Sequence, residues 1–201
     1  MSYLSEYITK SGAELKIQSM ISSLNVTFPA YITSFSDNMT SNWNEEQVYG
    51  RPDPIGNYQS TQRKISIAFD LPAADEDVAK AYLQRIQKVK QMMYPAYSQT
   101  AKNVDGVEVT QNALSLAKAP LVRISLGNLI TGQGEGLLGW ISSFSATPVV
   151  EMGMFNPSSG VFYPKVHQVS IEFTPQHEYD LGFNDKRGPL NGKFPTFPYG
   201  V

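Results

Sequence analysis

The clearest pattern in the chain is a strict alternation of apolar and polar residues over residues 64–71. One side of this stretch carries its large apolar side chains, Ile65, Ile67, Phe69 and Leu71. A period of two is typical of a β-strand that buries one face. A similar alternation near the end of residues 162–173 predicts a second strand of this kind.

A different period follows Pro72 and predicts an α-helix over about residues 74–93. Its apolar residues recur every three or four positions, at Val78, Tyr82, Ile86, Val89 and Met93. The three acids of residues 75–77 fall where the helix begins, and the partial positive charge of a helix N-terminus favours them. Pro95 prevents the helix from continuing. The helix therefore presents one apolar stripe to a sheet.

The rest of the central region predicts further strands and two connections. Residues 26–47 predict two strands in a hairpin with a turn near 36–38, and residues 120–128 and 137–146 predict two more strands. Residues 98–118 are polar, contain an Asp-Gly turn signal and predict an exposed loop. The glycine-rich residues 131–136 lack the lysine and the following helix of a phosphate-binding loop, so we expect a flexible hairpin connection.

The two ends of the chain are predicted as arms around a β domain of residues 26–180. Residues 1–25 have a nearly amphipathic helical spacing but contain Gly12 and many serines. They are interpreted as an N-terminal arm that becomes ordered against a neighbouring subunit, or as a short helix packed on its own domain. Residues 181–201 are rich in Gly, Pro and aromatic residues and cannot form a helix or a central strand. This C-terminal arm is expected to dock on a partner subunit through Phe194, Phe197 and Tyr199, or else to be a disordered tail.

Composition narrows the class of protein. With 201 residues the chain suits one domain with a substantial core. A net charge of -2 provides no basic field for duplex nucleic acid. The absence of cysteine excludes disulfides, thiolate catalysis and cysteine-ligated metals. We find neither a signal peptide nor an apolar run of about 20 residues, and expect a soluble protein that is not exported and has no membrane partner.

The most distinctive segment is residues 48–63, which joins a turn-rich block to the strand that follows. It holds Pro52 and Pro54 between two glycines, a composition that favours irregular turns. Arg51 and Asp53 are expected to form an ion pair, either across an interface or as a brace inside one subunit. No nucleophile has a base beside it, so the segment is interpreted as a contact motif with these members: Tyr49, Gly50, Arg51, Asp53, Pro54, Tyr58, Thr61 and Arg63.

Candidate chemistry elsewhere is weak. His167 and His177 show no metal-ligand spacing, and ordinary surface or interface histidines are expected. A lytic reaction would need two acids close together, and the sequence does not place any two of the candidates side by side in space. The candidates are Asp53, Asp70, Asp75, Glu76, Asp77, Glu135 and Glu151. Asp75 to Asp77 are explained by the start of the helix. There is no serine or cysteine nucleophile motif. We therefore expect no enzyme activity, no catalytic residue, no cofactor and no metal.

The order of the segments resembles that of baseplate and tail-tube-associated structural proteins of contractile-tailed bacteriophages. The resemblance rests on the strand of residues 28–35, the "YGR-x-DPI-x-x-Y-x-x-T-x-R" segment, and the strand and helix that follow. Downstream, residues 119–129, 139–145 and 163–173 are similar to the "P-P-x-V-x-V-x-x-G-N-L" ending of the proteins that start the tail tube on the baseplate. It covers roughly residues 26 to 175.

Element order and resemblance together imply an α+β fold, mainly an antiparallel β-sandwich or barrel of tail-tube type flanked by one helix. The resemblance implies a homohexameric ring in the virion that is made in the host cytoplasm, contacts other tail tube and baseplate proteins and passes the genomic DNA. The function would be to initiate or join the tail tube. The alternative is a tail-associated peptidoglycan-binding or lytic module, for which Tyr31, Trp43, Tyr49 and Tyr58 hint at an aromatic groove.

Overall fold

A computed structural model describes residues 14–29, 31–98, 101–104, 107–110, 115–132, 135–155, 160–178 and 181–183 of the chain. Its elements are β1 (Glu14–Ser19), β2 (Asn25–Pro29), β3 (Tyr31–Glu46), β4 (Ile55–Pro72), α2 (Glu76–Met92), β5 (Ala96–Ser98), β6 (Ala101–Val104), β7 (Val107–Thr110), β8 (Ser115–Lys118), β9 (Val122–Leu126), β10 (Leu137–Pro148), the 3-10 helix η2 (Val150–Met152), β11 (Met154–Phe155), β12 (Tyr163–Pro164) and β13 (Val166–Pro175).

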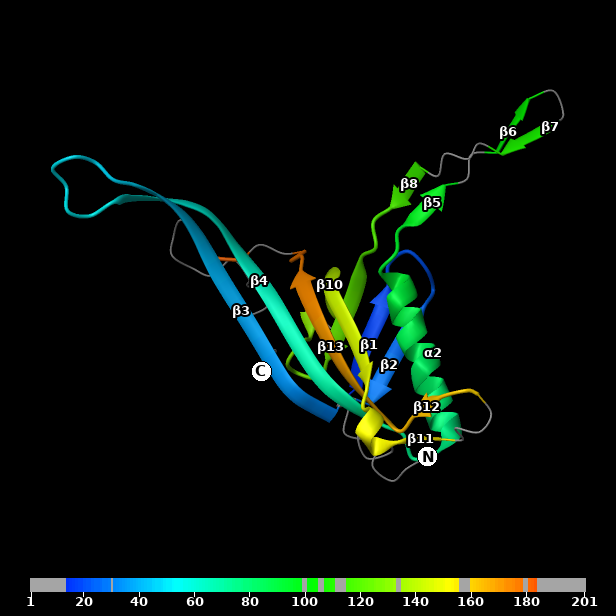
Figure 1. Ribbon diagram of the computed structural model, residues 1–201. Helices are drawn as coiled ribbons and strands as arrows, with labels where there is room; N and C mark the ends of the chain where they lie inside the picture. Colours follow the sequence, from blue (N-terminus) through cyan, green and yellow to red (C-terminus); the bar gives the residue numbers. More distant parts are fainter. Residues whose placement is uncertain are drawn as a thin grey trace.

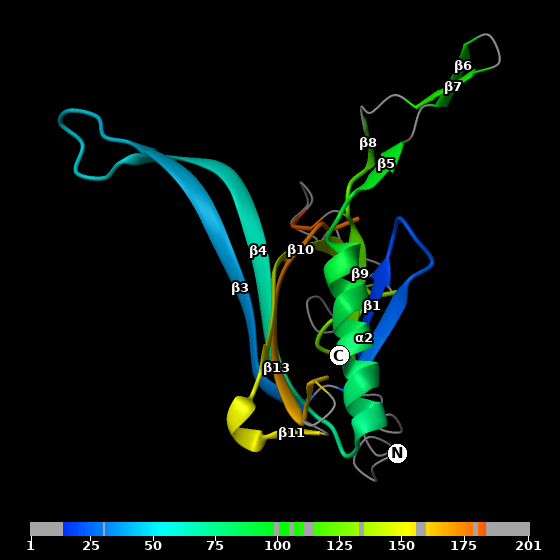
Figure 2. The ribbon, with the colours of Figure 1, turned by 45° about the vertical axis from the view of Figure 1, so that its right-hand side comes forward.

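Seven strands form one antiparallel sheet in the order β2-β1-β9-β10-β13-β4-β3, and α2 packs against one of its faces (Figures 1 and 2). Three small two-stranded sheets, β11–β12, β5–β8 and β6–β7, accompany it. The predicted α+β class, a mainly antiparallel sheet with one flanking helix, is confirmed. The described strands do not close into a barrel, so β2 and β3 remain as the two edges of the sheet.

The helix forms where the sequence predicts it. Asp75 is the N-cap residue, and its Oδ1 accepts a hydrogen bond of 2.8 Å from the backbone N–H of Val78. This bond satisfies one of the amide groups that have no partner inside the helix. The buried stripe of α2 consists of Ala79, Tyr82, Ile86, Val89 and Met92. It completes a core whose other members come from alternate positions of the strands.

The opposite face of the sheet is polar because the strands alternate. In β4 and β13 the buried residues face α2, and between them lie polar or small residues such as Ser66 and Ser170. The charged residues of the strands on this side include three cations and three anions: Lys16, Lys64, Arg123, Glu14, Asp70 and Glu172. This near-neutral surface is named the polar face below.

Strands β3 and β4 are much longer than the rest of the sheet. β13 pairs with β4 only from Ile65 to Pro72, so residues 55–64 of β4 pair with β3 alone. At about 3.4 Å per residue, this part of the hairpin extends roughly 30 Å beyond the sheet. Residues 38–64 are called the overhang; it projects from the body in Figure 1, as does a second arm that carries β5 to β8.

Several predicted boundaries are wrong. Residues 14–19 form β1 inside the sheet, not part of an arm or helix, because Leu15 and Ile17 alternate and are buried. Residues 31–46 form one strand without a turn near 36–38, since β4 offers a long partner and two bulges absorb the irregular register. Residues 98–118, expected to be a plain loop, contain the short strands β6, β7 and β8, and β8 pairs with β5.

Candidate functional site

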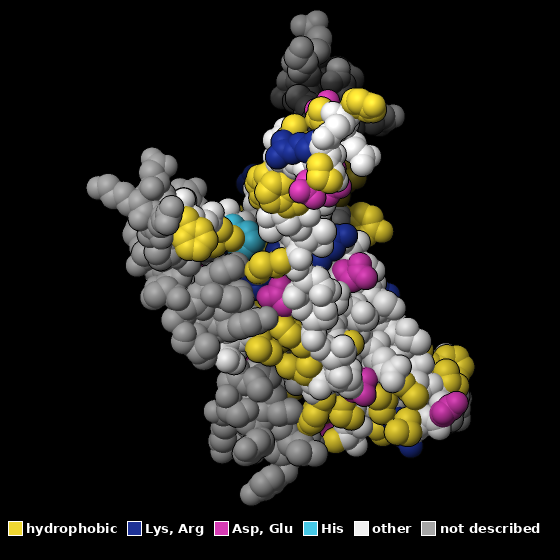
Figure 3. All heavy atoms as spheres, turned by 90° about the vertical axis from the view of Figure 1, so that its left-hand side faces the viewer, with side chains coloured by type: hydrophobic (Ala, Val, Ile, Leu, Met, Phe, Trp, Pro, Cys, Tyr) yellow, Lys and Arg dark blue, Asp and Glu magenta, His cyan; other side chains and the backbone are white. Residues whose placement is uncertain are grey.

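The surface with the strongest functional character is the overhang. It carries six large apolar side chains that are at least 42 % exposed: Met39, Trp43, Val48, Tyr49, Ile55 and Tyr58. Figure 3, in which the overhang side of the molecule faces the viewer, shows hydrophobic side chains interspersed with charged ones there. Apolar side chains gathered on a projecting hairpin have no core to enter, and such patches mark interaction sites.

Two aromatic rings form the centre of this surface. The ring centroids of Trp43 and Tyr58 lie 5.3 Å apart in an edge-to-face arrangement. Trp43 Nε1 donates to Ser41 Oγ at 2.8 Å, and the Tyr58 and Thr61 hydroxyls are also 2.8 Å apart. A bulge at this point brings Trp43 directly opposite Tyr58 in the register. Both rings are held in place although each is about half exposed.

A buried ion pair lies at the root of the overhang. Arg63 Nε and Nη2 donate to Asp37 Oδ1 and Oδ2 at 2.8 and 2.6 Å. The two side chains are only 4 % and 3 % exposed. This two-point geometry fixes both side chains and links β3 to β4 where the hairpin leaves the sheet.

His177 lies in the electrostatic field of this pair. Burial lowers the pKa of its imidazole, the Arg63 guanidinium lowers it further, and Asp37 opposes both effects. The neutral form of the imidazole is therefore favoured beside the ion pair. His167 is placed differently: it lies on the core face opposite Leu71, and burial lowers its pKa too.

The predicted contact motif is divided between the tip and the root of the overhang. Tyr49, Gly50, Arg51, Asp53 and Pro54 are all exposed in the tip loop, where Gly50 has a φ of +83°. The expected ion pair between Arg51 and Asp53 is absent from this described loop, whereas Arg63, the other arginine of the motif, pairs with Asp37.

Of the remaining motif residues, Tyr58 and Thr61 are in contact as expected, whereas Arg63 points into the buried root. A role of the motif at an interface stays a prediction. The docking residues Phe194, Phe197 and Tyr199 lie outside the described residues.

Asp37 and Met39 were not predicted as functional residues. Asp37 was expected in a turn because Ser36-Asp37-Asn38 has turn composition. A weaker pattern in the same residues indicates a strand. Alternate positions, which lie on one face of a strand, are occupied by Phe35, Asp37, Met39, Ser41 and Trp43.

The aromatic groove suggested for wall binding is not formed by the four residues named for it. Only Trp43 and Tyr58 are in contact. Tyr31 lies at the other end of β3 opposite Asp70, and Tyr49 is fully exposed in the tip loop. In the described part of the chain, no three His, Cys, Asp or Glu side chains are grouped so that they could hold a metal ion.

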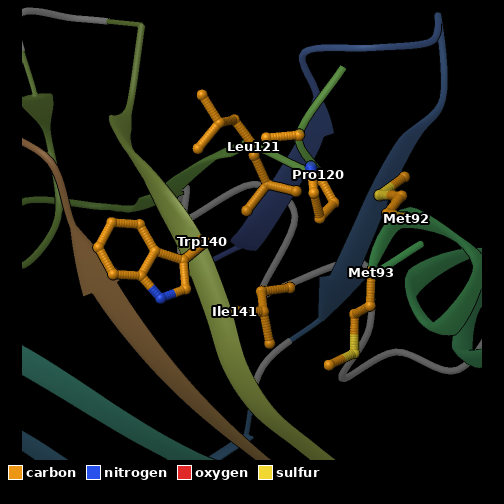
Figure 4. A pocket seen from close by; sticks show the side chains of 8 residues that line it. Met92, Met93, Pro120, Leu121, Trp140 and Ile141 are labelled. Atoms are coloured by element: carbon orange, nitrogen blue, oxygen red, sulfur yellow. The ribbon is translucent and has the colours of Figure 1, made fainter. Parts of the chain in front are cut away.

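A second feature is an apolar hollow at the C-terminal end of α2. It has a volume of about 280 Å³ and is lined by Met92, Met93, Ala119, Pro120, Leu121, Val122, Trp140 and Ile141. Figure 4 shows Ile141 and Met93 on the same side of β10, whereas the Trp140 indole projects from the other side of that strand. Trp140 is 43 % exposed and forms part of the rim.

None of the described helices is both long enough and apolar enough to span a membrane. No protein-family model matches the chain, and no curated protein matches it. Among solved structures, the chain is similar to one in the "Cryo-EM structure of the anti-feeding prophage (AFP) baseplate, 6-fold symmetrised". The identity is 9 %, the TM-score is 0.33, and the match covers 81 % of this chain and 87 % of that one. At this level of similarity we base the functional proposal on the chain's own residues.

Proposed function

We propose that this protein is a structural, non-catalytic subunit of a phage tail, which forms a homohexameric ring at the baseplate and initiates or joins the tail tube. The observation that carries the proposal is the overhang, an extended hairpin with exposed apolar side chains. The resemblance of residues 26 to 175 to tube-starting baseplate proteins supplies the biological context.

The unpaired edges of the sheet support assembly into a ring. Among the described strands, β2 and β3 each have a neighbour on one side only. Free edges invite pairing with another chain, and natural proteins normally cover them. Contact between the β3 side of one copy and the β2 side of the next uses two different surfaces, so it is head-to-tail and closes into a ring when the rotation fits.

In such a hexamer, each overhang lies against a neighbouring copy. This contact buries the aromatic side chains of the overhang that are exposed in one subunit. Trp43 and Tyr58 are suited to this role, because aromatic side chains bury a large area and are enriched where interfaces gain most of their energy. The ion pair of Arg63 and Asp37 sets the direction of the hairpin from inside one subunit. The hairpin can therefore meet a partner with little loss of conformational entropy.

The polar face is the surface we assign to the lumen. Within the described part of the chain, α2 covers the other face of the sheet, and the polar face is the one that can line a channel formed by joined sheets. Its charged residues balance, with three cations and three anions among those described on the strands. A wall of this kind lacks the dense positive charge that would hold DNA phosphates, which suits passage of the genome.

The test is the mass of the purified protein in solution, measured by light scattering and followed by negative-stain imaging. We expect rings of about six subunits, and seeding of tubes when a candidate tube protein is added. The double variant Trp43→Ser/Tyr58→Ser should remain folded, because both side chains are about half exposed in one subunit. It should lose the hexameric ring, because the proposed contact between copies depends on these two side chains.

The matched control is Phe162→Ser, which removes an aromatic side chain that is 60 % exposed on another part of the molecule. Rings should persist in this control. A wild-type protein that remains a monomer at all concentrations would contradict the proposal. Clearing of a peptidoglycan suspension by the purified protein would instead favour a lytic module.

A further inference from the structure

We propose that two copies of this chain associate end to end, through an acidic apolar surface on one copy and the apolar hollow with its surrounding lysines on the next. The contact differs from the lateral one proposed for the ring and does not use the overhang. The two surfaces lie at the two ends of α2. A helix of 17 residues separates its ends by about 25 Å.

The acidic end lies around the N-terminus of α2. Val150, Met152 and Phe162 are 65 %, 60 % and 60 % exposed there. Two backbone hydrogen bonds hold these segments near the helix start, from Ala73 N to Lys165 O at 2.7 Å and from Val149 N to Val166 O at 3.0 Å. Figure 3 shows hydrophobic side chains at this lower end of the molecule, where η2 and β11 lie in Figures 1 and 2.

The basic end is the hollow at the C-terminus of α2. Its volume of about 280 Å³ exceeds the cavity of about 150 Å³ that accepts a benzene ring, so an aromatic side chain such as Phe162 fits. Met92 and Met93 line it, and methionine sulfur makes favourable contacts with aromatic rings. The hollow is open to a partner, since Pro120 and Leu121 on its wall are only partly buried.

The charges of the two ends are complementary. Four exposed or partly exposed acids surround the first end, Asp75, Glu76, Asp77 and Glu151, against the two lysines Lys80 and Lys165. Three exposed lysines flank the hollow: Lys88, Lys90 and Lys118. Opposite potentials steer two surfaces together and suppress wrong partners.

The helix dipole explains part of this pattern but not all of it. Acids in the first turn and lysines in the last turn stabilise an isolated helix. Glu151 and Lys118, however, are not in α2, and they extend the same polarity to η2 and β8. The apolar residues at both ends are also unrelated to the dipole. A second copy of this chain satisfies both features at once, because each copy carries both surfaces.

Such a contact is heterologous and leaves one free surface at each end of the assembly, so it propagates along an axis. It orders copies along that axis, whereas the lateral contact orders them around it.

Site-directed cross-linking tests the contact cleanly because the natural chain has no cysteine. A mass-tagged Phe162→Cys protein is mixed with Leu121→Cys protein and treated with a short bis-maleimide. We expect the mixed dimer to be the main product. The matched control replaces Leu121→Cys by Ser170→Cys, an exposed position on the polar face, and should give little product.

Charge variants provide a second measurement that does not depend on the hollow. Raising the salt from about 0.1 M to about 1 M should reduce the product, because screening shortens from about 10 Å to about 3 Å. Reversing two lysines with K88E/K90E should weaken association roughly two- to thirtyfold, the range for two exposed ion pairs. Combining this variant with a D77K/E151K partner should restore it.

Equal cross-linking to Leu121→Cys and Ser170→Cys, or no mixed dimer from folded proteins, would overturn the end-to-end contact. Ring mass is measured separately on the Phe162→Ser protein. If cross-linking fails while rings persist, the end-to-end contact is wrong. If cross-linking succeeds while no rings form, the proposed ring is wrong.

Discussion

Replacing Arg63 by Met should destabilise the protein severely, although the overhang that it supports is largely exposed. Arg63 and Asp37 bind each other at two points, at 2.8 and 2.6 Å, with side chains that are 4 % and 3 % exposed. Arg63→Met leaves the Asp37 carboxylate buried without its partner.

The size of the effect follows from this burial. Removing one partner of a buried ion pair typically costs about 3–5 kcal/mol, because the remaining charge stays desolvated. For a chain of this length, 1 kcal/mol shifts Tm by about 2–4 °C, so the expected fall is roughly 6–20 °C. The pair as a whole is worth much less, since two apolar side chains of similar shape are often as stable as the ion pair.

The assay is urea unfolding followed by circular dichroism at one fixed protein concentration, since assembly also shifts apparent stability. The matched control is the double variant Arg63→Met/Asp37→Leu, which should recover most of the lost free energy of unfolding. The coupling free energy of the complete double-mutant cycle then measures the interaction.

Two results would refute this reasoning. A loss below about 1 kcal/mol in Arg63→Met would mean that the root is hydrated, as exposed pairs contribute only that much. A double variant as unstable as the single one would mean that the arginine acts by packing its stem and not by neutralising Asp37.

Two further predictions concern the helix start and the response to acid. Asp75→Ala should lower the free energy of unfolding by about 1 kcal/mol, measured in urea, because it removes the N-cap bond to Val78, whereas Asp75→Asn should lose little; an unchanged Ala variant would contradict the cap. Burial lowers the pKa of His167, so the unfolded chain binds more protons just below the ordinary histidine pKa of about 6.5. The contribution of His167 to stability should therefore be constant above about pH 6.5 and fall as the pH drops below it. Thermal unfolding between about pH 7 and pH 5 should show a flatter pH profile for His167→Gln than for the wild type. Equal slopes would be evidence against a buried neutral imidazole.

Local patterns in the sequence were enough to find the elements that bury one face. The helix from Glu76 to Met92 and the strand through Ile65 and Phe69 follow from periodicity, caps and proline, all of which act within a few residues. The same reasoning failed for residues 38–46 of β3. Both faces of that stretch are largely exposed, so its sequence shows no alternation of apolar and polar residues that would reveal one continuous strand.

The sequence by itself determined the α+β class, the position of the helix and the absence of cysteine chemistry. Only the tertiary structure decided which strands are neighbours, that β3 and β4 extend beyond the sheet, and that Arg63 pairs with Asp37, 26 residues away. It also decided that Glu151 of η2 lies near the acidic start of α2, and that Lys118 of β8 lies near its basic end. The physical reason is range: helix formation and strand alternation depend on neighbours in the chain, whereas strand order and buried ion pairs depend on contacts that form only when distant segments pack together.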